Sequence, residues 1–188
     1  MLVTQIVLLI TGTAFGFITL ALLARFFMQW GRVSFRNPIG QFIAAVTDWA
    51  VMPTRRVIPG LFGLDLASLL LAWVTQILYV LVKISLGLLV GESFTIPLLG
   101  LVGLARMAVY LVLAIVLVSV VLSWVGSRNP VAYVFSELSR PFLAPFRRLI
   151  RPLGGLDLSP LVLLLVLQIM LLVIQSLERS LLVLSPAF

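Results

Sequence analysis

The chain has 188 residues, of which 62% are hydrophobic and only 10% are charged, and its mean hydropathy is +1.25. A water-soluble domain of this size cannot hide so much apolar surface, so the composition indicates a protein that lies largely within a bilayer. The lack of cysteine and histidine excludes disulfides, thiol chemistry, histidine-ligated haem and ordinary zinc or copper sites.

Four long apolar stretches alternate with two polar inserts. About 20 residues of helix cross a hydrocarbon core, and we predict membrane helices over residues 2–30, 66–90, 97–125 and 158–182, with inserts over 31–65 and 126–157. The first stretch lacks an Arg/Lys-rich leader and a small-residue cleavage site, so we expect it to stay as a membrane anchor. The sequence therefore predicts an all-α polytopic membrane protein with four transmembrane helices.

The first insert contains the pattern of a short helix. Asn37 is a favoured N-cap, and Pro38 suits the first helical position. Apolar residues then recur at helical spacing: Ile39, Phe42, Ile43, Val46, Trp49 and Ala50. This spacing is typical of an amphipathic helix that lies flat in the headgroup layer. We expect Pro53 to end the helix and to bring Arg55 and Arg56 to the lipid surface.

The second insert repeats the first at a constant offset of 92 residues, without a gap. Identical residues recur in pairs: Arg36/Arg128, Asn37/Asn129, Pro38/Pro130, Pro53/Pro145, Arg55/Arg147, Arg56/Arg148, Gly63/Gly155, Asp65/Asp157 and Gln76/Gln168. Self-similarity at a fixed period is the signature of a repeat architecture. We therefore predict two tandem parallel hairpin repeats, residues 1–92 and 93–188, each with an amphipathic interfacial helix in its insert.

Positive charge is concentrated around the two inserts, whereas Lys83, Arg106 and Arg179 lie toward the opposite helix ends. By the positive-inside rule both inserts face the cytoplasm, and both termini lie outside. In a bacterium this predicts a multi-pass protein of the inner membrane with periplasmic termini. The net charge of +7 is thus a topology signal, and we expect no nucleic-acid partner.

The doubled signature NP…P-x-R-R…G-x-D resembles that of the YggT family, also called YlmG. The resemblance covers nearly the whole chain and rests on Asn37 to Asp65 and the matching residues of the second insert. It implies a small integral membrane protein of bacteria or plastids. It also implies roles that are linked variously to osmotic tolerance, to cell division and, in plastids, to cofactor assembly or nucleoid placement.

The charged residues of the inserts each have two interpretations. Asp65 and Asp157 either cap the membrane helices that follow them or pair with an arginine to hold the insert over the helix entrance. The arginines either fix topology alone or bind lipid phosphates or a partner's carboxylates through their guanidinium groups. The candidate binding residues are Arg55, Arg56, Arg147, Arg148 and Arg151.

Polar residues within the predicted spans are spaced seven apart, on one helix face. Gln76 and Lys83 lie in the second span, and Gln168 and Gln175 repeat that spacing in the fourth. We expect hydrogen bonds inside the bundle or with another subunit, and Lys83 can extend toward water. A conduction path is the alternative. We expect no Asp or Glu inside a span, which argues against a proton-coupled or cation-coupled carrier.

These features favour a membrane interaction or assembly factor whose inserts bind anionic lipid headgroups or an unidentified membrane or cytoplasmic protein. The alternative is a small oligomeric channel or transporter subunit, built from several copies of the chain, that affects ion or osmolyte balance. An enzyme is not expected, because the sequence offers no nucleophile–base pair, metal-ligand set or phosphate-binding loop. We likewise expect no cofactor.

Overall fold

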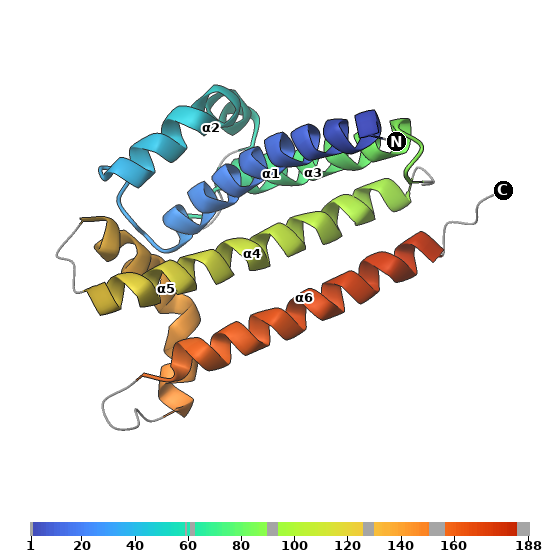
Figure 1. Cartoon of the computed structure of the whole chain (residues 1–188). Helices are drawn as coiled ribbons and strands as arrows, with labels where there is room; N and C mark the ends of the chain where they lie inside the picture. The colour runs from blue at the N-terminus through green and yellow to red at the C-terminus, as the bar shows by residue number, and fades with distance from the viewer. Residues whose placement is uncertain are drawn as a thin grey trace.

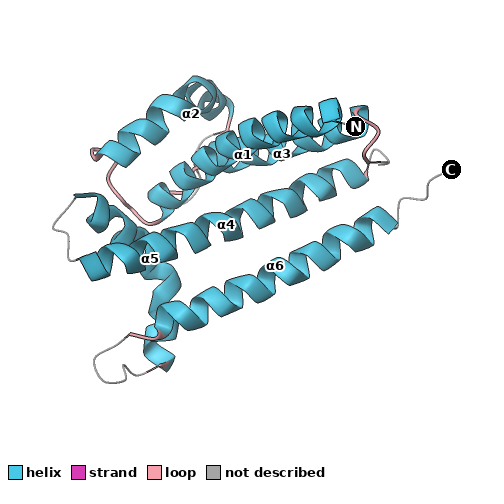
Figure 2. Cartoon of the chain, in the orientation of Figure 1, coloured by secondary structure: helices cyan, strands magenta, loops and turns pink. Residues whose placement is uncertain are grey.

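The computed structural model describes residues 2–58, 60, 63–89, 94–125, 130–150 and 157–183. Within these residues the fold consists of six α-helices and no β-strand, which confirms the predicted all-helical class (Figure 2). In chain order the helices are α1 (Leu2–Trp30), α2 (Pro38–Val57), α3 (Leu66–Ser85), α4 (Thr95–Val125), α5 (Pro130–Leu149) and α6 (Ser159–Val183).

Four of the helices, α1, α3, α4 and α6, are long and apolar enough to cross a membrane. At 1.5 Å per residue, the 20 residues of α3 span about 30 Å, the thickness of a hydrocarbon core. Figure 1 shows these four helices side by side, with α2 and α5 together at one end of the bundle. Helix α1 begins and α6 ends at the opposite end. We call these the insert end and the open end.

The bundle is held together by three clusters of buried apolar side chains. One joins α1, α2, α3 and α4 around Leu22, Leu23 and Val51. Another joins the two inserts through α1 and α4, with Ile43 of α2 and Val134 of α5 in the same cluster. The last lies between α4, α5 and α6. Helix α2 therefore packs on α1 and α3, whereas α5 packs on α4 and α6.

Helix α2 starts where the sequence predicts but does not end there. The Asn37 side chain accepts a hydrogen bond from the Gly40 amide at 2.8 Å, and Pro38 is the first helical residue. The prediction that Pro53 ends the helix was wrong, because α2 continues to Val57. Helix α5 likewise runs through Pro141 and Pro145 to Leu149. A proline inside a helix removes one ladder hydrogen bond and crowds the carbonyl four residues earlier. In α2 the ion pair of Arg55 with Asp65 holds the turn that follows Pro53.

The apolar residues of α2 differ in their exposure. Ile43 is buried against the bundle. By contrast, Phe42, Trp49 and Met52 are 55%, 72% and 54% exposed. The apolar residues predicted for this helix form one arc at 100° per residue, and the arc straddles the line where α2 leaves the bundle. One edge of the arc packs inward and the other stays outside.

Helix α3 ends five residues before the position that we predicted. Its C-terminus is a Schellman motif: the Gly87 amide donates to the Ile84 carbonyl at 2.9 Å, and the Leu88 amide donates to Lys83 at 3.0 Å. Gly87 adopts φ +68°, which only glycine reaches without strain. Hydropathy continues beyond this glycine, so an apolar pattern alone overestimates the length of the helix.

Candidate functional site

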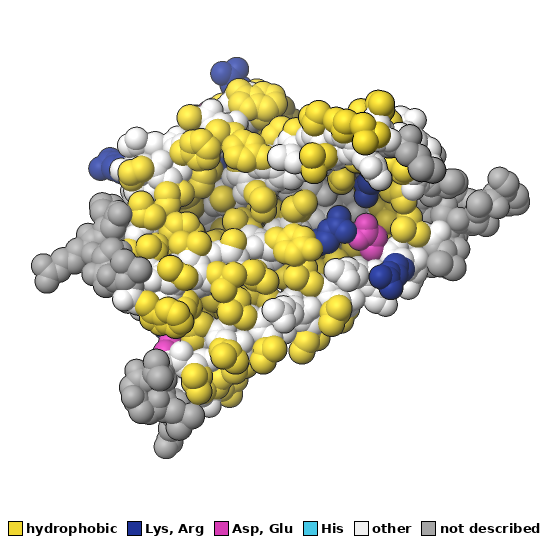
Figure 3. Space-filling model, viewed as in Figure 1, with side chains coloured by type: hydrophobic (Ala, Val, Ile, Leu, Met, Phe, Trp, Pro, Cys, Tyr) yellow, Lys and Arg dark blue, Asp and Glu magenta, His cyan; other side chains and the backbone are white. Residues whose placement is uncertain are grey.

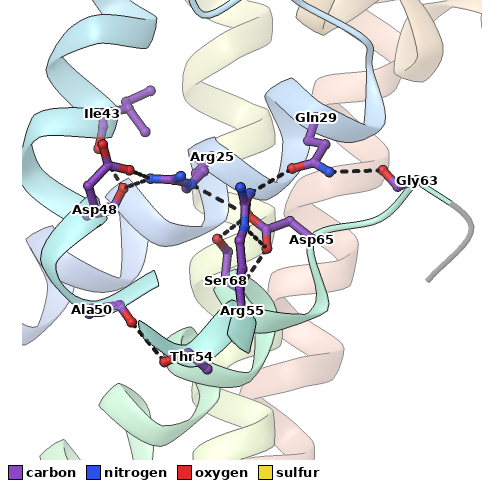
Figure 4. Close-up of polar contacts among 11 residues, drawn as sticks. Arg25, Gln29, Ile43, Asp48, Ala50, Thr54, Arg55, Gly63, Asp65 and Ser68 are labelled. Carbon is purple, nitrogen blue, oxygen red and sulfur yellow. Dashed lines mark hydrogen bonds and ion pairs between the residues drawn. The ribbon is translucent and has the colours of Figure 1, made fainter. Parts of the chain in front are cut away.

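The insert end contains a network of charged side chains around Arg25 of α1 (Figure 4). Arg25 is only 5% exposed. Its Nη1 donates to Thr47 Oγ1 at 2.7 Å and to Asp48 Oδ1 at 2.5 Å. Its Nε lies 3.5 Å from Asp65 Oδ2, close enough for charge attraction, but it has no hydrogen-bond partner among the described residues. Arg25 thereby connects α1 to α2 and to the entrance of α3.

Asp65 is the second centre of the network and is 1% exposed. Arg55 of α2 binds both of its oxygens, with Nε at 3.2 Å from Oδ1 and Nη2 at 2.5 Å from Oδ2. The Ser68 amide and hydroxyl donate to the same carboxylate at 3.3 and 2.6 Å. Asp65 therefore caps α3 and pairs with an arginine at the same time. The two interpretations of the sequence describe one arrangement.

Electrostatics favour the ionised form of Asp65. Burial raises the pKa of this carboxyl, but hydrogen bonds from Arg55 and Ser68 outweigh the effect and hold the pKa below its usual range. Gln29 completes the arrangement, because its Oε1 accepts from Arg55 Nη2 at 3.0 Å while its Nε2 donates to the Gly63 carbonyl at 3.3 Å. Two arginines thus face two aspartates, and the network is neutral as a whole.

The second insert has the same ion pair in a more open setting. Arg147 Nε donates to Asp157 Oδ2 at 2.8 Å, and the Ser159 amide donates to Asp157 Oδ1 at 3.0 Å. These two charged side chains are 52% and 40% exposed. Burial raises the pKa of Asp157, but hydrogen bonds from Ser159 and Arg147 lower it more, so it too lies below its usual range.

The network around Arg25 has no equivalent among the residues of the second half that the structure describes. At the 92-residue offset, Leu117 stands in place of Arg25, and Arg140 stands in place of Asp48. The Arg140 side chain is 73% exposed and lies 3.7 Å from Glu137. The first insert is therefore fastened by a buried network, whereas the second presents cations at its surface.

Four of the five arginines proposed from sequence lie among the described residues, and they divide into two groups. Arg55 and Arg147 are bound to aspartates of their own inserts. Arg56 and Arg148 are exposed and form no ion pair with any residue that the structure describes. The fifth arginine, Arg151, and the predicted cap Asn129 lie outside the described residues.

The two glutamine-bearing spans differ in how they place these side chains. Gln76 of α3 is 1% exposed, and its Nε2 donates to Thr19 Oγ1 at 2.9 Å. Its Oε1 packs so close to Gly103 of α4 that a Cβ there would lie 2.6 Å away. Gln168 and Gln175 of α6 are exposed. The polar stripe therefore faces the bundle interior in α3 but lies at the surface in α6.

A second charged group lies within the spans, near the open end. Arg106 of α4 and Glu178 of α6 form an ion pair at 2.6 Å, with each side chain 22% exposed. The expectations that Arg106 marks a helix end and that no acidic residue lies inside a span were both wrong. Helix α4 begins 11 residues before Arg106, and α6 continues past Glu178 to Val183. An arginine inside one apolar span and a glutamate inside another were the signal in the sequence.

These features define the class of protein: a multi-pass helical membrane protein with two more polar helices packed at one end of four apolar ones. The CCB3/YggT family model matches residues 4–86 and 98–177. The chain belongs to this family.

Curated relatives cover most of the chain. An "Uncharacterized protein in proC 3'region" of Vibrio alginolyticus is 39% identical over 160 residues, which cover 84% of this chain and 86% of the relative. The "Uncharacterized protein YggT" of Escherichia coli (strain K12) is 37% identical over 159 residues, or 84% and 83% of the two chains. A relative in Pseudomonas aeruginosa is 40% identical over 147 residues, or 76% and 74%. No solved structure matches the chain.

Proposed function

We propose that this protein is a non-catalytic interaction and assembly factor of a bacterial inner membrane, and that its insert end binds anionic lipid headgroups. In this proposal the insert end faces the cytoplasm, as the positive-inside rule favours, and both termini are periplasmic. The binding groups are Arg56 and Arg148, whereas Arg55 and Arg147 hold the inserts in place.

The observation that carries the proposal is the position of Arg56 on α2. At 100° per residue, Arg56 falls on the same side of the helix as Phe42, Trp49 and Met52, all of which are exposed. A cation among large exposed apolar side chains fits a lipid surface, where the rings enter the acyl boundary and the guanidinium meets phosphate. Arg148 is exposed beside Leu149, which is 81% exposed.

We propose further that the chain contains two units of one plan, each a span, an insert with an interfacial helix and a second span. The gapless 92-residue offset supports this, as do the Arg–Asp pairs that end both inserts. The two units place two arginine sites at the same end of the bundle. Each basic residue near an anionic leaflet contributes about 1 kcal/mol, so Arg56 and Arg148 together contribute about 2 kcal/mol.

Native mass spectrometry of the full chain, purified in a neutral detergent, tests the lipid site. Phosphatidylglycerol and phosphatidylcholine are added separately, and the bound lipids per chain are counted. We expect the Arg56→Gln/Arg148→Gln variant to bind phosphatidylglycerol with an affinity lower by about tenfold or more, because about 2 kcal/mol of binding free energy is removed. The matched control is Arg36→Gln, which removes an exposed insert charge elsewhere. Equal loss in the control, or no preference for the anionic lipid, refutes the proposal, as does capture of a protein instead of lipid.

A second candidate function is a small channel or transporter subunit assembled from several copies. The charged pair of Arg106 and Glu178 within the spans favours it, because intramembrane ionisable residues commonly line transport paths. So does Gln168, a polar side chain exposed in the middle of α6, where a second copy would satisfy its amide. Ion or osmolyte flux into liposomes that is abolished by Glu178→Gln would support transport. Equal flux into liposomes with and without the protein would reject this candidate function.

A further inference from the structure

A groove of about 410 Å³ opens at the side of the bundle, between α1 and α6 with α4 as its floor. Such a volume is within the range of small-ligand sites. Its apolar lining includes Leu8, Leu9 and Met107, and its polar lining includes Thr13, Arg106 and Gln175. Figure 3 shows positive and negative side chains meeting on this face, among apolar ones and toward the open end. The groove is far from the arginines of the inserts, which lie at the other end of the bundle.

The charges beside the groove do not balance. Arg106 meets Glu178 at 2.6 Å. Arg106 and Glu178 also line an enclosed void of about 10 Å³ together with Lys83. Lys83 Nζ lies 4.9 Å from the ring centroid of Tyr79, a residue that lines both the void and the groove. Two cations and one carboxylate therefore line this void within the bundle, where an uncompensated charge is unfavourable. An anion entering from the groove would balance them.

Arg106 has the donors to receive this anion. A guanidinium carries five N–H groups in a planar fork, and the contact with Glu178 uses Nη1. Phosphate accepts such donors in bidentate fashion. Glu178 lies five residues before the end of α6, about 7.5 Å along its axis, and Arg106 lies 11 residues, about 16.5 Å, from the start of α4. Lys83 lies two residues before the end of α3.

We propose that this groove binds one anionic phospholipid from the leaflet at the open end. Its phosphate meets Arg106 in the groove, next to the void that Lys83 lines, and one acyl chain lies along Leu8, Leu9 and Met107. The groove opens sideways between two apolar helices, so a lipid enters from the bilayer. A water-soluble anion would instead leave the apolar wall of the groove uncovered.

The test uses the delipidated full chain in a neutral detergent, with native mass spectrometry as the measure of bound lipid. The probes are phosphatidylglycerol, phosphatidylcholine and inorganic phosphate. We expect Lys83→Gln to weaken phosphatidylglycerol binding about fivefold, the effect of one basic charge near an anionic lipid. Lys83→Arg retains the charge and is expected to retain binding.

Glu178→Gln gives the sharpest contrast, because it removes the carboxylate that competes with phosphate for Arg106. We expect it to strengthen phosphatidylglycerol binding, whereas a purely structural ion pair predicts weaker binding or unfolding. The insert variant Arg56→Gln/Arg148→Gln is expected to leave the binding of phosphatidylglycerol in the groove unchanged. This result would separate the groove from the insert site. Weaker binding in Glu178→Gln, equal binding in all variants, or displacement of the lipid by inorganic phosphate overturns the proposal.

Discussion

Arg25 is the residue on which the geometry of the insert end depends, because its guanidinium meets groups from two other elements. Asp48 lies on α2, and Asp65 lies at the entrance of α3. Buried ion pairs add little net stability against an apolar replacement of all partners, but removing one partner leaves the others uncompensated. The contacts of this one residue therefore hold α2 in one position on the bundle.

Arg25→Leu gives position 25 the leucine that occupies the equivalent position, Leu117, in the second half of the chain. We expect it to lower the free energy of unfolding by about 2 kcal/mol, because Thr47 and two aspartates lose a buried partner. Thermal or denaturant unfolding in detergent, followed by circular dichroism, measures the change. Arg36→Leu, at an exposed position, is the control and should change stability by less than about 0.5 kcal/mol. Equal effects of both variants would contradict the assigned role of Arg25.

The lowered pKa of Asp65 predicts how stability depends on pH. A carboxyl whose pKa is lower in the folded state contributes stability that is present above its unfolded value and is lost as pH falls through the folded value. We therefore expect the melting temperature of the wild type to fall below about pH 4, near the unfolded pKa of Asp. Asp65→Asn should already be less stable at pH 7 and show a shallower acid dependence. If the melting temperature of Asp65→Asn fell with pH as steeply as that of the wild type, groups other than Asp65 would cause the acid dependence.

The sequence could predict Asp65 but not Arg25. A carboxylate just before an apolar run is a local signal for a cap, and Arg55 precedes Asp65 at a spacing that repeats in the second insert. The partners of Arg25 lie more than 20 residues away, and they meet it only because α2 folds back on α1. From sequence alone Arg25 counts as one more cytoplasmic charge. Its burial is a property of tertiary packing.

At the scale of elements, α2 is placed by its first turn. Gly40 is buried, and a Cβ there would lie 2.6 Å from Phe35 Cα and 2.9 Å from the Phe35 carbonyl oxygen. The chain before the helix therefore passes directly over this turn. Sequence patterns predicted the start of α2 from Asn37 and Pro38. The continuation through Pro53 depends on Arg55 reaching Asp65, which no local pattern encodes.

Gly40→Ala should move α2 or its leading loop, since the clash is with backbone atoms. We expect a loss of about 2 kcal/mol in the free energy of unfolding, as for overpacked sites. Chemical unfolding in detergent measures it. Gly87→Ala, at a positive φ in an exposed turn, is the comparison and should lose only about 1 kcal/mol. If Gly40→Ala left the free energy of unfolding unchanged, the backbone of Phe35 would lie farther from Gly40 than described.

For the whole molecule, the two halves share an order of elements but differ in how far their polar and charged side chains are buried. The first half buries Gln76 and surrounds Arg25 with partners, whereas the second exposes Gln168 and presents Arg140. The 92-residue offset alone predicted equivalent halves. It could not show the difference, because α3 packs between α1 and α4 while α6 has neighbours on fewer sides. The more exposed half is the one that leaves surfaces for lipid or a second copy.

This difference predicts unequal effects for two equivalent substitutions. Gln76→Leu should lower the free energy of unfolding by about 1 kcal/mol, because it loses the bond to Thr19 and crowds Gly103. Gln168→Leu should leave the stability of the monomer unchanged and lower only the fraction of oligomer. Unfolding in detergent and light scattering after gel filtration give the two readouts. Similar stability losses in both variants would contradict the different placement of the glutamines.

The most direct test of the central claim, that the insert end binds anionic lipid, is energy transfer from Trp49 to dansyl-labelled lipid in bilayers. Trp49 is 72% exposed beside Arg56, and substituting Phe for Trp30, Trp73 and Trp124 makes it the sole donor. We predict stronger transfer to dansyl phosphatidylglycerol than to dansyl phosphatidylcholine, with the difference reduced by salt and by Arg56→Gln. Equal transfer to the two lipids, unaffected by Arg56→Gln, would contradict the account.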